Sequence, residues 1–245
     1  MRVIRSLVHS IGRGLGVDVV PYLSVRHSIG RRLRLLKALD VDLVMDVGAN
    51  GGGYAGELRT FGYRGRILSF EPLTEPFERL RIRSSRDPYW DIQQIAIGSE
   101  AGRRHLNVAA NRGASSSFLP MLDLHAREAP TAGYVAVEDV AVERLDVSSA
   151  HSVQRARSPF LKVDVQGYEA EVLQGAAGIL DRLVGMQLEL SLTPLYQDAP
   201  HYRQLLSAVS DLGFDLVGLE PGFTATDGRL LQADGLFARR EGPSR

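Results

Sequence analysis

The stretch 41–53 constrains the fold more than any other part of the chain. A short apolar run, Val41–Val47, leads directly into a turn that contains four glycines, Gly48 and Gly51–Gly53. Glycine adopts backbone conformations that other residues avoid, and it lets the main chain approach a ligand closely. We therefore expect a buried strand that enters a tight turn at its carboxyl end, followed by a short helix over 54–61.

Strand and helix patterns keep alternating along the rest of the chain. Apolar runs predict strands at 66–70, 92–97, 160–165, 184–190, 214–219 and 235–239, and helices are predicted at 75–83, 169–180 and 201–212. Two further predicted strands, 104–109 and 134–142, flank a polar loop. Such alternation is typical of an open, mostly parallel sheet with helices on both faces. We predict an α/β, Rossmann-like fold.

The composition excludes several classes of protein. Hydrophobic residues make up 44% and charged residues 24%, which rules out disorder for most of the chain. Basic and acidic residues balance at 29 each, which argues against a nucleic-acid partner. The absence of cysteine removes disulfides, cysteine zinc sites and thiol catalysis. No apolar run approaches the roughly 20 residues of a membrane helix, and no secretory signal pattern is present, so we expect a cytoplasmic protein without a transmembrane segment.

The N-terminal residues 1–39 differ from the rest in charge, with eight Arg or Lys residues against the single acid Asp18. Ile29, Leu33, Leu36 and Leu39 form an apolar stripe at helical spacing. We predict a basic helical extension at 1–39, a main domain at 40–240 and a tail at 241–245. The extension either packs on the body or a second subunit in a homodimer, or contacts an anionic membrane or a lipid-linked acceptor.

Two acidic residues follow or end the first two strands of the main domain. Glu71, after the second strand, can accept hydrogen bonds from both hydroxyls of a ribose, which indicates a nucleoside cofactor at the carboxyl ends of the strands. Asp46, at the end of the first strand, would repel a pyrophosphate but suits the amino and sulfonium groups of S-adenosylmethionine. The alternative is a helix cap and a surface acid.

A competing interpretation comes from the string Gly51-x-Gly53-x-x-Gly56, which matches the dinucleotide-binding pattern. It would make the chain an NAD-binding, dehydrogenase-like protein. The string starts late, because the turn already begins at Gly48, so the methyl donor is favoured over NAD. A non-catalytic nucleoside-binding module is the third alternative.

Several short motifs together resemble the FkbM-type methyltransferase family. They are Asp46-Val47-Gly48-Ala49-Asn50-x-Gly52, Phe70-Glu71-Pro72, Gln94–Gly98, Val142–Asp146 and Leu161–Glu169. The resemblance covers about 40–240. It implies a class I S-adenosylmethionine-dependent fold, in which a seven-stranded, mostly parallel sheet has its last strand antiparallel. It also implies O-methylation of a saccharide, glycolipid or glycosylated natural product.

The resemblance also implies roles for individual residues. Cofactor contacts are expected from Asp46, Gly48, Ala49, Asn50, Gly52, Glu71, Pro72, Ala96, Ile97 and Asp164. Acceptor contacts are expected from Gln166 and Tyr168, and from Ser115 and Ser116 in the serine-bearing loop at 111–134. The family usually has Glu at the position of Gln166, so any role of that carboxylate is altered here.

A sugar hydroxyl needs a general base, or a divalent cation that lowers its pKa, before it can accept a methyl group. Asp164 and Glu189 end consecutive core strands and are the first candidates for the base. Together they could also bind Mg²⁺ through oxygen ligands. His125 and His151 are the other candidate bases, since we expect them to flank the loop that covers the acceptor.

Overall fold

The computed structural model of the chain describes residues 14–17 and 19–240. Its centre is a seven-stranded sheet in the order β3-β2-β1-β7-β8-β10-β9. The strands are β1 (Leu43–Val47), β2 (Arg66–Phe70), β3 (Trp90–Gln93), β7 (Pro159–Val163), β8 (Gly185–Ser191), β9 (Phe214–Pro221) and β10 (Gln232–Arg239). β10 runs antiparallel to both of its neighbours, and every other pair is parallel. The predicted α/β sheet with an antiparallel last strand is therefore confirmed.

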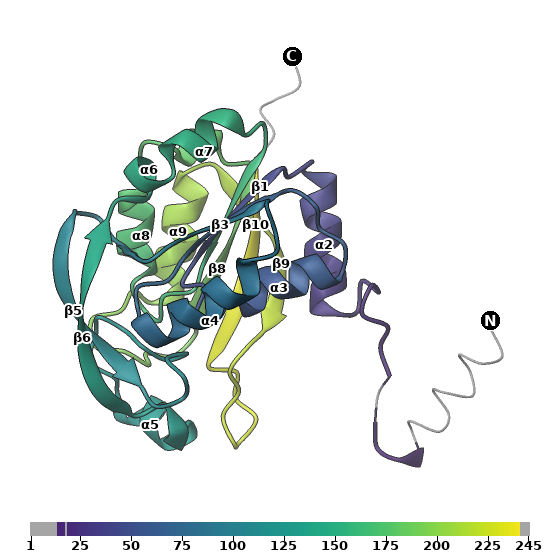
Figure 1. Cartoon of the computed structure of the whole chain (residues 1–245). Coiled ribbons are helices and arrows are strands. Elements are labelled where there is room, and N and C mark those ends of the chain that lie inside the picture. The colour runs from purple at the N-terminus through teal and green to yellow at the C-terminus, as the bar shows by residue number, and fades with distance from the viewer. Residues whose placement is uncertain (1–13, 18, 241–245) are drawn as a thin grey trace.

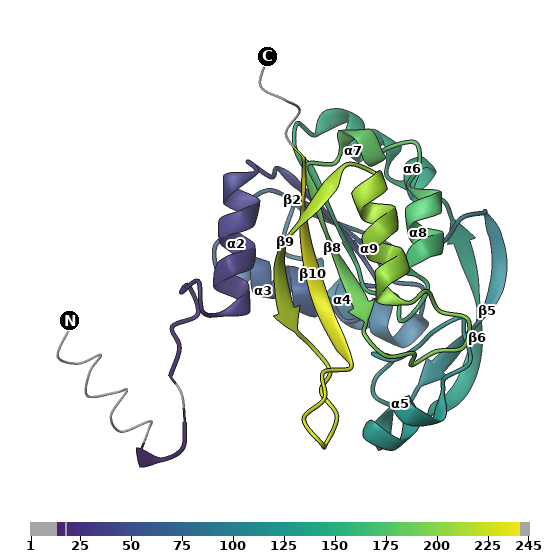
Figure 2. The same cartoon turned by 180° about the vertical axis from the view of Figure 1, so that it is seen from behind.

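Helices cover both faces of this sheet (Figures 1 and 2). One face carries α2 (Ser28–Ala38), α3 (Gly53–Thr60) and α4 (Thr74–Ser84). The other carries α6 (Leu145–Ser148), α7 (Ala150–Arg155), α8 (Glu169–Gly175) and α9 (Tyr202–Asp211).

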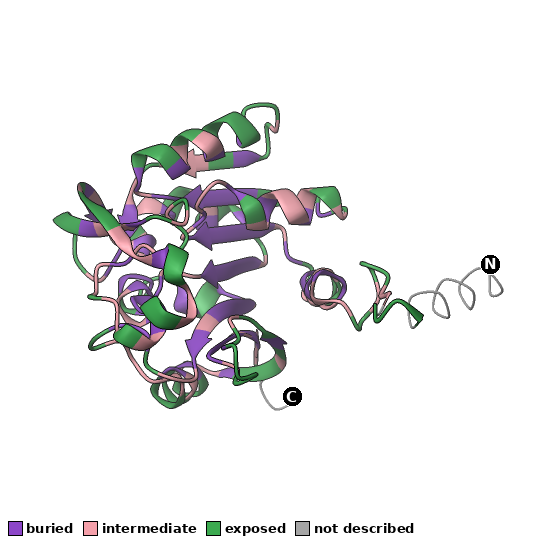
Figure 3. Cartoon of the chain, turned by 90° about the horizontal axis from the view of Figure 1, so that it is seen from below, coloured by how far each residue is buried: buried purple, intermediate pink, exposed green. Residues whose placement is uncertain are grey.

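Side chains alternate between these two faces along β1. Leu43, Met45 and Val47 join the core under α6–α9, while Val44 joins the core under α2 and α3. Asp46 shares the face of Val44, because successive side chains of a strand point to opposite sides. All five residues of β1 are buried, which explains why its sequence is a continuous apolar run with one acid. Figure 3 shows that the strands at the centre of the protein are mostly buried, while exposed residues lie on the surrounding helices and loops.

A second, three-stranded sheet stands beside the first and has the order β4-β6-β5. It contains β4 (Ala96–Ile97), β5 (Gly102–Ala109) and β6 (Tyr134–Glu143), with α5 (Asp123–Glu128) and a short 3-10 turn (Pro130–Ala132) between β5 and β6. The single strand predicted at 92–97 is therefore wrong. β2 ends at Phe70, so the chain beyond Gln93 has no partner in the main sheet and pairs with β6 instead.

The helix α2 belongs to the body of the protein. Ile29 and Leu36 are buried in the core shared with α3, and Arg32 donates hydrogen bonds to Glu57 and Glu220 at 3.1 and 2.9 Å. α2, which lies within the predicted extension, thus packs on the main core, and the boundary at 39 stays a prediction.

Residues 1–13 and 241–245 lie outside the described residues, so membrane contact and dimerisation through the N-terminus stay predictions, as does the tail. Across 14–17 and 19–240, no helix combines the length and apolar character that crossing a bilayer requires.

Candidate active site

The glycine turn after β1 packs directly on the turn after β7. Gly48 has φ of +75°, and a Cβ atom there would lie 1.9 Å from the carbonyl oxygen of Asp164. Its amide and that of Ala49 donate to the carbonyl of Phe70, at 3.1 and 3.0 Å. The turn is thus tied to the ends of both neighbouring strands, and only glycine fits at its first position.

Glu71 is held in place by the same turn. Its Oε2 accepts from the amide of Asn50 at 2.8 Å, and its Oε1 accepts from the amide of Leu73 at 2.9 Å. Burial raises the pKa of Glu71 to about 7, against the opposing effect of these two hydrogen bonds. The carboxylate retains unused lone pairs and lines a cavity between the two sheets.

This first cavity collects most of the predicted cofactor contacts. Its wall contains seven of them, Gly48, Asn50, Glu71, Pro72, Ala96, Ile97 and Asp164, and three predicted acceptor contacts, Ser116, Gln166 and Tyr168. Sequence reasoning missed the apolar and aromatic part of the wall, which includes Phe70, Leu73, Ile95, Leu106, Phe118 and Val165. Apolar strand and loop residues look like ordinary core positions in a sequence, so no signal marked them.

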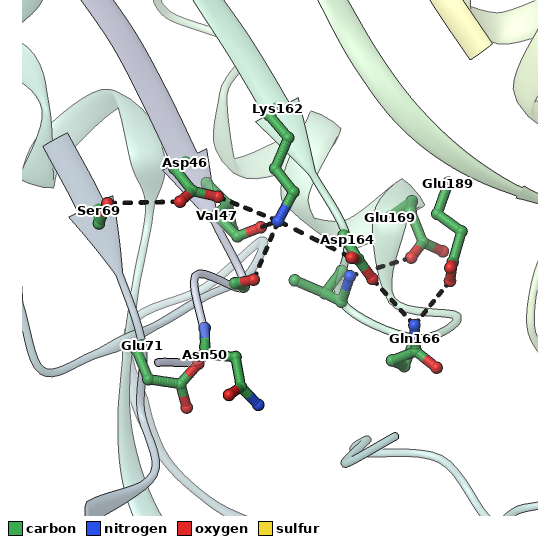
Figure 4. A network of polar contacts seen from close by, with 12 residues as sticks. Asp46, Val47, Asn50, Ser69, Glu71, Lys162, Asp164, Gln166, Glu169 and Glu189 are labelled. Carbon is green, nitrogen blue, oxygen red and sulfur yellow. Dashed lines mark hydrogen bonds and ion pairs between the residues drawn. The ribbon is translucent and has the colours of Figure 1, made fainter. Parts of the chain in front are cut away.

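The predicted contact between Asp46 and a cationic cofactor is wrong. Asp46 is fully buried on the α3 side of the sheet and is absent from the cavity wall. Its carboxylate pairs with the ammonium of Lys162 at 3.0 Å and accepts from Ser69 Oγ at 3.4 Å (Figure 4). The negative charge of Asp46, which would attract a sulfonium, is therefore neutralised by the Lys162 ammonium. Gly52 is also absent from this wall and is the N-cap residue of α3.

The predicted pair of Asp164 and Glu189 is bridged by an amide. Nε2 of Gln166 donates to Asp164 Oδ1 at 2.9 Å and to Glu189 Oε2 at 2.8 Å (Figure 4). Glu189 also accepts from Gln232 Nε2 at 2.7 Å. An N–H donor thus lies where a bridging cation would have to bind, so these residues do not fit the predicted Mg²⁺ site. Across 14–17 and 19–240, no group of three or more His, Cys, Asp or Glu side chains is placed to hold a metal ion.

Glu189 is consequently a supporting residue and is absent from the cavity wall. Burial and the neighbouring Asp164 carboxylate raise its pKa well above the ordinary value. Gln166 itself is fixed from the other side, because its Oε1 accepts from the hydroxyl of Tyr196 at 2.7 Å. Three side chains therefore fix the Gln166 amide, and Ser117 Oγ donates to its backbone carbonyl at 2.7 Å, where φ is +57°.

A second cavity of about 440 Å³ adjoins the first on the α3 and α4 side. The two share Gly48, Asn50 and Asp164 as a common wall. The remaining wall consists of Ala49, Gly51, Gly53, Tyr54, Asn111 and Gln187, the cations Arg32, Arg79, Arg83, Arg112 and Lys162, and the acid Asp234. Of the predicted cofactor residues, only Ala49 lines the second cavity without also lining the first.

Asp234 is the acidic residue that sequence reasoning missed. It lies on β10, opposite Glu189 of β8 in the sheet register. Burial, and next the charge of Asp164, raise its pKa to about 6, while Arg32 and Lys162 oppose the shift. The signal available in the sequence was a single acid within the otherwise uncharged and mostly apolar stretch 233–238 of that strand.

Neither predicted catalytic histidine reaches the site. His151 is exposed on α7, among residues at the amino ends of β1 and β2, whereas the glycine turn lies at their carboxyl ends. His125 is buried in the apolar cluster around Tyr196 and Leu231, and this burial lowers its pKa. Both predictions are wrong, because a histidine's position relative to a loop does not determine the direction of its side chain.

Of the two predicted serines, only Ser116 lines a cavity. Ser115 is buried behind the wall, where its backbone amide donates to Asn111 Oδ1 at 3.1 Å. Tyr168 contacts Phe118 with ring centroids 4.9 Å apart, and its hydroxyl oxygen accepts a hydrogen bond from Arg104 Nη1. The serine loop therefore contributes shape and one hydroxyl to the first cavity.

Comparison with known proteins gives a family match over most of this region. The methyltransferase FkbM domain model matches residues 46–216. A curated relative, the hexuronic acid methyltransferase AglP of Haloferax volcanii, is 27% identical over 149 residues, which make up 61% of this chain and 56% of the relative. The matched region thus spans little more than half the length of that relative.

Solved structures with similar folds include an rRNA methylase from Streptococcus thermophilus, with a TM-score of 0.49, 14% identity and coverage of 89% of this chain and 99% of that one. Another is the fibrillarin of Aeropyrum pernix with natively bound S-adenosyl-L-methionine, with a TM-score of 0.46, 13% identity and coverage of 80% and 66%. The family match spans well over half of the chain and contains the glycine turn, Glu71 and Asp164. This chain belongs to the FkbM methyltransferase domain family.

Proposed function

We propose that this protein is an S-adenosylmethionine-dependent O-methyltransferase that methylates a hydroxyl of a saccharide, either free or within a glycolipid or glycosylated natural product. The family supports methyl transfer. The hexuronic acid named for the relative AglP is itself a sugar derivative, which supports a saccharide acceptor.

The first cavity has the chemistry that an adenosine group needs. Glu71 offers two carboxylate oxygens that are already oriented by backbone amides, which suits the two hydroxyls of a ribose. Ala96, Ile97 and Phe118 supply apolar walls for a flat base. Gly48 brings the main chain against this space without a side chain.

The observation that carries the proposal is the wall shared by the two cavities. Gly48, Asn50 and Asp164 face both spaces, so a group bound in one meets a group bound in the other at these residues. The second cavity, at about 440 Å³, lies within the range of sites for small ligands. It is the acceptor side in this proposal.

S-adenosylmethionine, when bound, would supply a methyl carbon for in-line attack by the acceptor oxygen, with the C–S bond breaking and the sulfur leaving as a neutral thioether. The task of the protein is to orient the acceptor hydroxyl and take its proton. Asp164 and Asp234 are the carboxylates of the acceptor cavity. Because the pKa of Asp234 is raised to about 6, its carboxylate is mostly ionised at neutral pH and is also a better proton acceptor than an ordinary aspartate.

The proposal is tested by binding and turnover together. Calorimetry with S-adenosylhomocysteine should show binding, and NADH should leave the melting temperature unchanged. A screen of mono- and oligosaccharides and glycolipids with labelled methyl donor, with and without Mg²⁺, should then give a methylated product.

Stabilisation by NADH alone would support the dehydrogenase-like alternative and overturn the proposal. Binding of S-adenosylhomocysteine with no methylated acceptor in the screen would instead favour the non-catalytic nucleoside-binding module.

A further inference from the structure

The charged residues of the second cavity separate into two groups by their place in the fold. Asp164 follows β7, and Asp234 lies on β10, so both acids belong to the half of the sheet beyond β1. Arg79 and Arg83 lie on α4, which follows β2 on the other side of β1, and Arg112 lies in the loop after β5. Both acids of the cavity therefore lie toward β7 and β10, where the paired cations Lys162 and Arg32 also lie, and the side toward α4 carries only arginines.

Most cations of this wall already have carboxylate partners. These pairs are Arg32 with Glu57 and Glu220, Lys162 with Asp46, and Arg79 with Glu75. Arg83 differs, because its only partner among the described residues is the carbonyl oxygen of Gly52, to which Nη1 donates at 2.9 Å. The guanidinium of Arg112 has no hydrogen-bond or ion-pair partner within 14–17 and 19–240. Each guanidinium carries five N–H donors, so most of their donors are unused in this part of the chain.

The backbone that carries Arg112 is fixed in an unfavourable conformation. Arg112 has φ of +62°, in the left-handed region that residues with a Cβ rarely adopt. Its carbonyl oxygen accepts from Asn50 Nδ2 at 3.1 Å and from Arg79 Nη2 at 2.9 Å. These two contacts tie the loop to the glycine turn and to α4, so the Arg112 side chain starts from a defined point at the cavity.

Arg83 is held by contacts with α3 and with the glycine turn. Its stem passes Gly56 of α3 so closely that a Cβ atom there would lie 3.2 Å from Arg83 Cδ. The contact with the Gly52 carbonyl then holds the guanidinium beside the glycine turn. Two guanidinium groups without a carboxylate partner among the described residues thus border one cavity. Arg83 is held through its own Nη1 and Arg112 only through its backbone carbonyl, and the other N–H groups of both have no partner among the described residues.

We propose that these two arginines bind an oxyanion on the acceptor, so that the substrate is an acidic saccharide carrying a carboxylate or a phosphate. This inference rests on the proposed function. Guanidinium groups bind carboxylate and phosphate through paired N–H donors. Arg83 and Arg112 hold the anionic group at the basic end of the cavity, and the acceptor hydroxyl then lies toward Asp164 and Asp234. The opposite orientation would place an anion beside two carboxylates.

The experiment compares paired acceptors in which one member carries an anionic group at C6 and the other a neutral hydroxyl. Methyl glucuronide is paired with methyl glucoside, and glucose 6-phosphate with glucose, using the full chain and labelled methyl donor. The acidic member of at least one pair should have the higher kcat/KM, and the pair that shows the difference identifies carboxylate or phosphate. Saturation-transfer NMR on the protein loaded with S-adenosylhomocysteine measures binding of the same four probes without turnover.

The variants Arg83→Gln and Arg112→Gln should each raise KM for the acidic acceptor about tenfold, which is typical of a lost charge-assisted hydrogen bond. Their affinity for S-adenosylhomocysteine should stay near the wild-type value, and their KM for neutral acceptors should rise less than their KM for acidic ones. Arg86→Gln is the matched control, because Arg86 is an exposed arginine just beyond α4 that lines neither cavity of the site.

Three results would overturn the inference. Neutral probes could bind and react as well as acidic ones, or no acidic probe could bind the loaded protein. The Gln variants could also weaken S-adenosylhomocysteine binding by the factor seen in KM, which would assign the arginines to the carboxylate of the cofactor. Loss of the proposed function is distinguishable, because wild-type protein would then fail to bind S-adenosylhomocysteine at all.

Discussion

The ammonium nitrogen of Lys162 lies 3.0 Å from Oδ1 of Asp46, and both side chains are almost fully buried beneath α3. The same ammonium donates to the carbonyl of Gly48 at 3.0 Å. The pair therefore supports the glycine turn from below, and it leaves no net charge beneath the cofactor cavity.

Replacing one member of this pair should strongly lower the unfolding free energy. Lys162→Met leaves the Asp46 carboxylate buried without a counter-charge, which typically costs about 3–5 kcal/mol of unfolding free energy. Urea unfolding measures the loss. The chain's other lysine, Lys37, is exposed on α2, so Lys37→Met is the control and should change stability by less than about 0.5 kcal/mol. The double variant Asp46→Asn/Lys162→Met should recover part of the stability, and no recovery would contradict the pairing.

Two glycines of the turn should respond in opposite ways to the same substitution. Gly48→Ala places a Cβ atom 1.9 Å from a backbone oxygen at a positive φ, so it should destabilise the protein by several kcal/mol and weaken cofactor binding. Gly53 begins α3, and a Cβ atom added there would have no neighbour within 4 Å, so Gly53→Ala should be neutral or stabilise by up to about 1 kcal/mol. Thermal unfolding and calorimetry check both. Equal damage from Gly53→Ala would revive the dinucleotide interpretation.

Binding of S-adenosylhomocysteine should weaken as the pH falls below about 7. The pKa of Glu71 is raised to about 7 by burial, and only the ionised carboxylate can accept from two ribose hydroxyls. Binding then requires loss of a proton, so affinity should fall by up to about tenfold per pH unit in this range. Calorimetry in buffers of different ionisation enthalpy measures the proton released. Glu71→Gln should remove the proton release, whereas Glu78→Gln, on the exposed side of α4, should not.

The raised pKa of Glu71 also makes the unfolding free energy depend on pH. An acid whose pKa is higher in the folded protein binds its proton more tightly there than in the unfolded chain. The contribution of Glu71 is therefore fully present below about pH 4.5 and is lost as the pH rises toward 7. The unfolding free energy of the wild type relative to Glu71→Gln should decrease across this interval, as urea titrations at several pH values can show.

Local sequence patterns predicted the features that depend on neighbouring residues. The glycine turn, Glu71 and Asp164 were found because each follows a strand whose apolar run is visible in the sequence. The partner of Asp46 was not, since Lys162 meets it only through the pairing of β1 with β7. Nor could the bridging amide of Gln166 or the arginines of α4 be placed, because long side chains reach the site from positions that carry no local signature.

Asp234 lies close to Asp164 in space although the two residues are far apart in the sequence. β10 lies beside β8 although it is the last strand of the chain, so its acid reaches the acceptor cavity that Asp164 also lines. Asp234 is the proposed proton acceptor, so Asp234→Asn should lower kcat by about 10²- to 10⁴-fold. Affinity for S-adenosylhomocysteine should be retained, because Asp234 does not line the first cavity.

The pH profile separates this role from a structural one. Wild-type kcat should rise with pH through about 6 as Asp234 loses its proton, and the rise should be absent in Asp234→Asn. Asp227→Asn, at an exposed turn where Asp227 pairs with Arg229, is the matched control and should keep the wild-type profile. If Asp234→Asn retains full turnover while Asp164→Asn loses it, Asp164 is the base, and the raised pKa of Asp234 reflects only its burial beside that carboxylate.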